Sequence, residues 1–199
     1  MRIPPPAAGP DSVPLIDGAE VLRSWRAVTD AVHAEGGAIA AQLWLRARSA
    51  TFLTVAGKGQ ETISPSGIDV AGNRVGRALR IDELGALADV YVKAARNARD
   101  ARFDAVEVRG GYGYLFDQFL WGTLIDAPTA TAARSLHVRT PFPAEVVAAA
   151  WDAVGSGFPI IFRFSQWKNQ PGVLVSANVV GVVHVTLTPP STTIVCPVT

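Results

Sequence analysis

The sequence contains little cysteine, little histidine and almost no net charge. Its single cysteine, Cys196, excludes an internal disulfide and any zinc site built on cysteines. The 18 Lys and Arg residues nearly balance the 17 Asp and Glu residues. The formal net charge of +1 excludes a field that would hold nucleic acid or an anionic membrane by itself. The three histidines lie in separate contexts, without the spacing of a metal site.

Long apolar runs are also absent. The run at 157–162 is short and ends at Arg163, well below the roughly 20 residues that cross a bilayer. The first six residues include three prolines and hold no apolar segment of a signal peptide. Hydrophobic residues make up 49% of the chain, which is enough for a globular core and too much for a disordered chain. We therefore predict a cytoplasmic protein of one domain, or part of a larger one.

Hydrophobic residues recur with alternating helical and strand-like spacing along the chain. Helical spacing predicts three helices, at about 18–35, from Asp82 through Ala98, and at about 143–154. Short apolar runs predict four strands, near 38–44, 103–108, 159–164 and 179–187. This order predicts parallel strands with right-handed crossovers, in an open sheet or in a barrel.

Composition divides the chain into three parts. Residues 1–17 are rich in proline and predict an extended lead-in, residues 18–187 hold the alternating elements of one domain, and residues 188–199 form an irregular tail. Within the domain, residues 49–80 have no sustained period, which predicts a long, mobile loop.

Local signals predict where two of the helices begin. Asp17 is the expected N-cap of the first helix, and Asp82 is the expected N-cap of the second. The expected apolar face of the first helix consists of Leu22, Trp25, Val28 and Val32.

Polar side chains follow three of the predicted strands, and functional groups of parallel α/β folds lie at such strand ends. Gln42 offers an amide that suits a flavin or pyrimidine edge, unless neighbouring backbone satisfies it. Arg109 would hold an anion and Tyr114 would donate a proton; the alternative is a rim salt bridge and loop packing. Arg163, inside an apolar strand, requires a carboxylate, a phosphate or an electron-rich ring edge as partner.

Six segments occur in a characteristic order: Trp25–Gly37, Ala41–Trp44, Ala94–Arg99, Phe103–Val108, Gly113–Leu120 and Phe162–Lys168. Together they resemble the Old Yellow Enzyme family of NAD(P)H:flavin oxidoreductases, over roughly residues 18–168. The resemblance implies a (β/α)8 barrel with FMN at its carboxyl-terminal face. It also implies that the substrate is a small activated alkene, reduced by a hydride that passes from NAD(P)H through the flavin.

The resemblance implies roles for five side chains. Gln42 matches a glutamine that hydrogen-bonds the pyrimidine edge of the flavin. Arg163 matches an arginine beside flavin N1 and O2, where positive charge stabilises the reduced, anionic flavin. Tyr114 matches the tyrosine that protonates the α carbon of the substrate. Arg109 and Tyr112 replace the two residues that clamp the substrate carbonyl; both still donate hydrogen bonds and would favour a more anionic substrate.

The chain departs from the family elsewhere. Leu45–Arg48 replaces the usual His-x-Gly-Arg, and Ala132–Arg139 lacks the glycines of the family motif Tyr-Gly-Gly-Ser-Leu-Glu-Asn-Arg. Family members are about twice as long, so the first barrel strand is expected before residue 1 and the FMN phosphate site after residue 190. Four strands leave two open sheet edges, through which the chain could self-associate.

We therefore expect an α/β fold, a partial (β/α)8 TIM-type barrel with parallel strands and flanking helices. The expected function is that of an FMN-dependent NAD(P)H oxidoreductase impaired by truncation. Two alternatives are a non-catalytic barrel fragment and a half-barrel interaction module that another chain completes.

Overall fold

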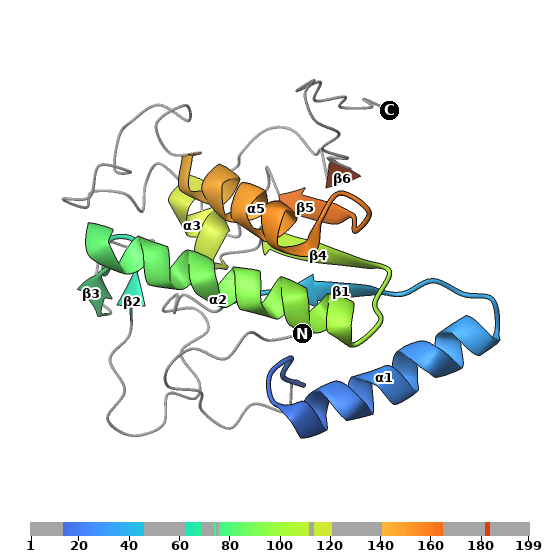
Figure 1. Ribbon diagram of the computed structural model, residues 1–199. Helices are drawn as coiled ribbons and strands as arrows, with labels where there is room; N and C mark the ends of the chain where they lie inside the picture. Colours follow the sequence, from blue (N-terminus) through green and yellow to red (C-terminus); the bar gives the residue numbers. More distant parts are fainter. Residues whose placement is uncertain are drawn as a thin grey trace, which may run out of the picture.

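The computed structural model describes residues 14–45, 63–68, 74, 76–111, 114–120, 141–164 and 182–183. Its main sheet has the order β1-β4-β5-β6 (Figure 1). The strands are β1 (Ala40–Leu43), β4 (Ala105–Gly110), β5 (Ile160–Phe164) and β6 (Val182–Val183). β1 pairs with β4, and β4 with β5, in parallel. The predicted parallel sheet is thus confirmed for three strands.

The predicted direction of the fourth strand is wrong. Of the predicted strand at 179–187, the structure describes β6, which pairs antiparallel with β5. An apolar run indicates a strand but not its direction, which depends on the connection that precedes it. Between residues 164 and 179 the sequence shows no helical period. It therefore predicts no crossover helix, which usually joins two parallel strands.

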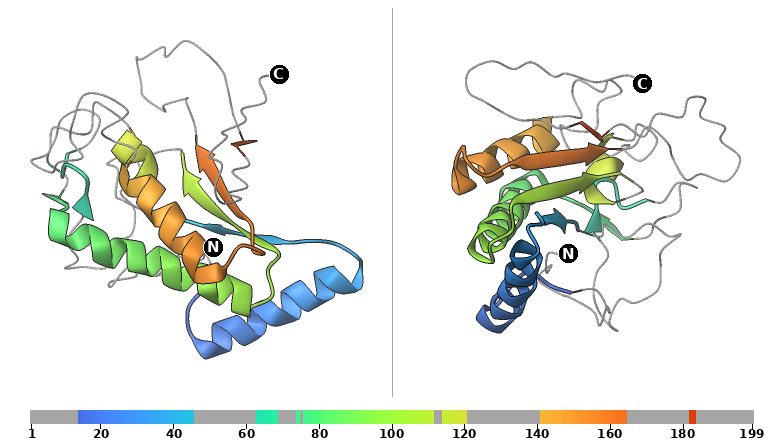
Figure 2. Two further views of the ribbon diagram at one scale, coloured as in Figure 1. Left: turned by 45° about the horizontal axis from the view of Figure 1, so that its top comes forward. Right: turned by 90° about the vertical axis from the view of Figure 1, so that its right-hand side faces the viewer.

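Three long helices lie side by side on one side of the sheet (Figure 2). They are α1 (Ala19–Ala34), α2 (Ile81–Asp100) and α5 (Pro141–Val154). α2 contacts both other helices as well as β1 and β4. In the described part of the chain, no helix is both long enough and apolar enough to cross a membrane.

The core lies between this helix layer and the sheet. Alternate strand residues point into it, and Leu43, Val106, Val108 and Ile160 are at most 2% exposed. α2 contributes buried alanines, whose small side chains allow it to approach the sheet closely. Tyr91 of α2 is also buried, and burial raises the pKa of its hydroxyl.

A fourth helix, α3 (Leu115–Leu120), follows β4 and was not predicted. Its first five residues are all buried. A helix buried all round has no polar stripe, so hydrophobic periodicity could not reveal it.

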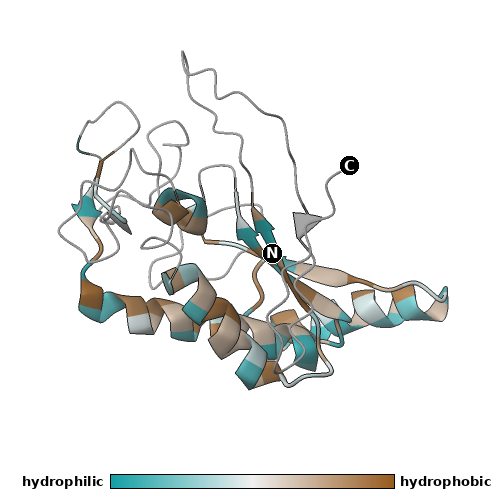
Figure 3. Cartoon of the chain, turned by 90° about the horizontal axis from the view of Figure 1, so that it is seen from above, coloured by the Kyte–Doolittle hydropathy of each residue, from teal (hydrophilic) through white to brown (hydrophobic). Residues whose placement is uncertain are grey.

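The apolar face predicted for α1 is only partly correct. Leu22 and Trp25 pack against the core, but Val28 is 43% exposed. The buried side chain is Thr29, whose hydroxyl donates to the carbonyl of Ala101 at 2.8 Å. Figure 3 shows the mixture of polar and apolar residues along the helices. Because the Ala101 carbonyl satisfies the hydroxyl of Thr29, a polar residue can occupy the buried position.

Asp17 is not the N-cap of α1, contrary to the prediction. Gly18 holds that position, with φ of 93°, and the Asp17 carboxylate accepts the Gly18 N–H at 3.0 Å. Asp17 also pairs with Lys93 of α2 at 2.9 Å. The acidic residue therefore anchors the start of α1 to α2 instead of capping the helix.

The carboxylate of Asp104, just before β4, links the start of β1 to the end of α1. Its carboxylate accepts the backbone N–H of Ile39 at 2.7 Å and contacts His33 Nε2 at 3.0 Å. The Ile39 N–H, and after it His33, lowers the pKa of Asp104. This contact holds the register in which Ala40 lies beside Ala105.

The predicted loop at 49–80 contains regular structure in its described residues. β2 (Ile63–Ser64) and β3 (Arg77–Ala78) form a parallel pair. Gly67 has φ of 76°, and a Cβ there would lie 2.9 Å from backbone atoms of β3, so only glycine fits. Strands of two residues are too short to show a period, which is why this pair was missed.

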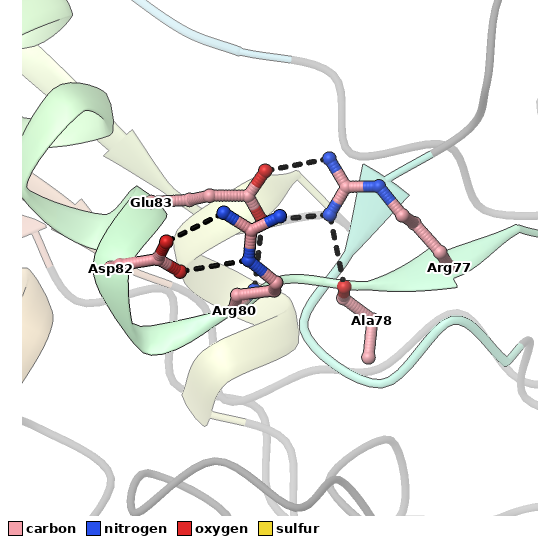
Figure 4. Close-up of polar contacts among 5 residues, drawn as sticks. All are labelled: Arg77, Ala78, Arg80, Asp82 and Glu83. Carbon is pink, nitrogen blue, oxygen red and sulfur yellow. Dashed lines mark hydrogen bonds and ion pairs between the residues drawn. The ribbon is translucent and has the colours of Figure 1, made fainter.

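The N-terminus of α2 is capped by Glu83 rather than by the predicted Asp82 (Figure 4). Arg80 holds the N-cap position, and its backbone N–H donates to the Glu83 carboxylate at 2.8 Å. Arg77 of β3 donates twice to the same carboxylate, at 2.7 and 2.6 Å. Asp82 instead accepts two hydrogen bonds from the Arg80 side chain. The Arg77 guanidinium, and after it the Arg80 N–H, lowers the pKa of Glu83 to about 2.

We predict that Glu83→Gln lowers the free energy of unfolding near neutral pH by about 1–2 kcal/mol, because it removes a charge-assisted cap. The pKa of Glu83 is lower in the folded state than its ordinary 4.5, so its contribution is present above pH 4.5 and lost as the pH falls toward about 2. Urea unfolding between these pH values should show a smaller acid loss for Glu83→Gln than for the wild type. Parallel pH profiles of the two proteins would contradict this.

We also predict that Gly110→Ala lowers the free energy of unfolding by about 1–3 kcal/mol through overpacking. A Cβ at this position would lie 2.5 Å from Phe162 Cζ and 3.0 Å from the Arg163 carbonyl oxygen. The matched control is Gly85→Ala, at an open position of α2 with nothing within 4 Å. Denaturant unfolding should show that Gly85→Ala is more stable than the wild type by about 0.5–1 kcal/mol. Equal stability of Gly110→Ala and the wild type would refute this role of Gly110.

Candidate functional site

The sheet face opposite the helices carries a row of polar side chains, here called the inner face: Gln42 of β1, Glu107 and Arg109 of β4, and Arg163 of β5. Side chains alternate along a strand, so these residues point away from the core that their neighbours fill. Gln42 lies beside Glu107, and Arg109 beside Arg163, in the strand register. All four are partly buried.

Gln42 joins two charged residues of β4. Its amide nitrogen donates to Glu107 Oε1 at 2.5 Å, and its amide oxygen accepts from Arg109 Nη1 at 2.9 Å. The two partners fix which end of the amide points in which direction. The amide thus presents a defined donor and acceptor arrangement on the inner face.

Arg163 contacts the same carboxylate from the other side. Its Nη1 lies 3.8 Å from Glu107 Oε1, and the two side chains are 32% and 19% exposed. A carboxylate was one of the three partners that the sequence required for this arginine. Amide and guanidinium groups from β1 and β5 therefore converge on one oxygen atom of β4.

Tyr114 lies beside this network, directly before α3. Its ring packs under the guanidinium of Arg109, with Arg109 Cζ 4.2 Å from the ring centroid. Trp44 meets the same ring edge-on, at 5.1 Å between centroids. The tyrosine ring is therefore held between a side chain of β4 and a side chain that follows β1.

The structure brings together four of the five predicted site residues: Gln42, Arg109, Tyr114 and Arg163. The fifth, Tyr112, lies outside the described residues. β4 extends two residues beyond the predicted 103–108, so Arg109 is part of the strand rather than of the following turn. The roles assigned to these residues stay predictions.

The sequence analysis missed Glu107 and Trp44. Glu107 interrupts an apolar strand two residues before Arg109, and a spacing of two predicts the same sheet face. The same spacing relates Trp44 to Gln42. The signal was therefore present in the strand period, but a role became visible only when β1, β4 and β5 lay side by side.

The inner face fits the pyrimidine edge of a flavin, which presents an N–H group between two carbonyl oxygens. The amide of Gln42 supplies both a donor and an acceptor, and the guanidinium of Arg163 supplies donors and positive charge. These are the residues of this chain that would hold FMN. The described residues contain no group of three or more His, Cys, Asp or Glu that could hold a metal ion.

Comparison with known proteins gives concordant matches. Residues 3–187 match the sequence model of the NADH:flavin oxidoreductase / NADH oxidase family. The chain is 38% identical to the NADP-dependent oxidoreductase lnbE of Aspergillus flavus over 168 residues, which are 84% of the chain and 44% of that protein. It is 34% identical to the probable inactive reductase easA of Epichloe festucae var. lolii, covering 84% of the chain and 44% of that protein. The chain thus spans less than half the length of these relatives.

A solved structure gives the same result for the fold. Morphinone reductase in complex with tetrahydroNAD superimposes with a TM-score of 0.72 and 30% identity, over 82% of this chain and 49% of that one. The predicted partial TIM-type barrel is confirmed by this likeness. Membership of the matched family implies FMN as the cofactor and NADH or NADPH as the reductant.

We predict that Glu107 and Arg163 are energetically coupled. A double-mutant cycle of Glu107→Gln and Arg163→Gln, followed by urea unfolding, should give a coupling free energy of about 0.5–3 kcal/mol, because the two groups are partly buried and share a network. The control cycle uses Arg102→Gln and Asp30→Asn, an exposed ion pair at 2.8 Å, for which about 0–1 kcal/mol is expected. Additive effects at Glu107 and Arg163 would rule the coupling out.

Proposed function

The chain belongs to the NADH:flavin oxidoreductase / NADH oxidase family, and we propose that it provides the flavin-facing surface of an FMN-dependent NAD(P)H oxidoreductase that reduces activated alkenes. One observation carries this proposal: Gln42 and Arg163 converge on Glu107 from two strands, beside the ring of Tyr114. These groups suit the two tasks of such a site, which are flavin recognition and delivery of a proton.

The first task falls to the inner face. Gln42 binds the pyrimidine edge through an amide that Glu107 and Arg109 already orient, so little freedom is lost on binding. Arg163 places positive charge beside that edge, where negative charge collects during the reaction. When bound, FMN supplies the redox chemistry, taking a hydride from NAD(P)H and passing it to the alkene.

The second task falls to Tyr114. Its hydroxyl delivers the proton that completes reduction at the α carbon of the alkene. Arg109 and Trp44 confine its ring from two directions, which holds the hydroxyl in one place. Tyr112 is proposed to assist in binding the substrate oxygen.

A second candidate is a non-catalytic flavin-binding or interaction protein. Arg109 stands where the family resemblance implies a carbonyl-clamping residue, and one similar protein is named as a probable inactive reductase. Retention of flavin separates the candidates in part: a yellow protein that reduces no alkene fits the second one. Self-association, cytoplasmic location and the domain bounds 18–187 stay predictions.

We predict that Arg163→Ala weakens FMN binding by the 199-residue chain about tenfold or more, because each charge-assisted hydrogen bond contributes roughly 1.5–3 kcal/mol. Flavin fluorescence during titration measures the affinity. The control variant Arg96→Ala, on the exposed face of α2, should leave the affinity unchanged. Equal FMN affinity of Arg163→Ala and the wild type would refute this role of Arg163.

Tyr114→Phe tests the assigned proton donor. At saturating FMN, we predict unchanged flavin affinity and a loss of alkene reduction of about a hundredfold or more, because the ring stays and only the hydroxyl is removed. Reduction of the flavin by NADPH should continue at the wild-type rate in stopped-flow measurements. An equal loss in both steps would show that Tyr114 acts structurally.

A further inference from the structure

Two arginines lie in register on neighbouring strands of the inner face. Arg109 of β4 and Arg163 of β5 are direct partners in the parallel ladder, and neighbouring strands are about 4.8 Å apart. Both side chains belong to the inner face, because Arg109 alternates with the buried Val108 and Gly110, and Arg163 lies beside Arg109 in the ladder. Like charges placed directly beside each other in a sheet repel one another. This end of the face therefore brings two guanidinium groups together, with the Glu107 carboxylate 3.8 Å from Arg163 as its partner.

The carboxylate of Glu107 lies deeper along the same face. Glu107 precedes Arg109 by two residues, so it is one pleat closer to the amino end of β4. It contacts Arg163 and Gln42 there. The cationic groups thus come after the carboxylate in the direction of the strand ends, where ligands of parallel α/β folds bind.

The guanidinium of Arg109 is also held in a fixed orientation. It donates to the Gln42 oxygen at 2.9 Å and stacks on the Tyr114 ring at 4.2 Å. Trp44 supports the other edge of that ring. A fixed planar guanidinium matches the two oxygens of a carboxylate better than the single oxygen of an aldehyde or ketone. Because the arginine is already ordered, less conformational entropy is lost when a ligand binds.

Resting on the proposed function, we propose that Arg109 determines substrate choice, and that the site takes a small electrophilic alkene that carries a carboxylate. The carboxylate binds the guanidinium of Arg109, which keeps the alkene beside Tyr114. A neutral enal or enone of the same size offers the guanidinium one uncharged oxygen and forms no ion pair with it. We expect a difference in affinity of at least tenfold between the two substrate classes.

The test compares trans-cinnamate with cinnamaldehyde, which differ only in the carboxylate. Ligand-observed NMR on the full chain measures both dissociation constants at saturating FMN and again without FMN, independently of turnover. The wild type should bind cinnamate at least tenfold more tightly, and added salt should weaken cinnamate binding only. Arg109→Gln should lower cinnamate affinity at least tenfold and lower cinnamaldehyde affinity by a clearly smaller factor. The matched control, Arg96→Gln, removes an arginine from the exposed face of α2 and should change neither.

Two further comparisons keep the outcomes distinct. Arg109→Lys retains the charge but not the planar group, and should lose part of the cinnamate affinity even if Arg109→Gln fails to fold. Equal or tighter binding of cinnamaldehyde by the wild type, or unchanged cinnamate affinity in both variants, overturns the proposal. Flavin fluorescence on the same samples measures FMN binding, and so tests the proposed function separately from the substrate class. Selective cinnamate binding without FMN binding would support the substrate class and refute the flavin-dependent function.

Discussion

The carboxylate of Glu107 ties three parallel strands together on the face opposite α1, α2 and α5. Its own residue lies in β4, it accepts a hydrogen bond from Gln42 of β1, and it pairs with Arg163 of β5. Side chains alternate between the two faces, so a register slip of one residue would move these groups under the helices and the apolar residues into the site. The close approach of β4 to β5, which Gly110 permits, holds the same register from the core side.

The strand positions could be predicted from the sequence, and so could four residues that the structure brings near one another. Short apolar runs bounded by polar residues located β1, β4 and β5. The polar residue near the end of β1 is Gln42, and the one near the end of β5 is Arg163. The resemblance to flavin oxidoreductases added Tyr114 and gave each residue an expected role. The strand predictions succeeded because they rest on the period of a strand, which is local in sequence. The roles of Gln42, Tyr114 and Arg163 stay predictions.

The features that were missed depend on contacts between distant segments. Glu83, rather than Asp82, caps α2 because Arg77 of β3 lies next to it, and a capping pattern does not include that arginine. Thr29 replaces Val28 at the buried position of α1 because a carbonyl of Ala101 accepts its hydroxyl. The direction of β6 depends on a connection without periodicity. In each case a satisfied hydrogen bond or a chain connection outweighed local propensity.

The alternation of buried and inner-face residues along β4 has a consequence for how such a protein can change during evolution. Val106, Val108 and Gly110 are buried in the core, while Glu107 and Arg109, between them, lie on the inner face. Substitutions at the odd-numbered positions change the polar groups of the inner face and leave the contacts with the helices unchanged. Substitutions at the even-numbered positions alter stability and leave the recognising groups in place. Selection can therefore act on the inner face and on stability through different positions of one strand.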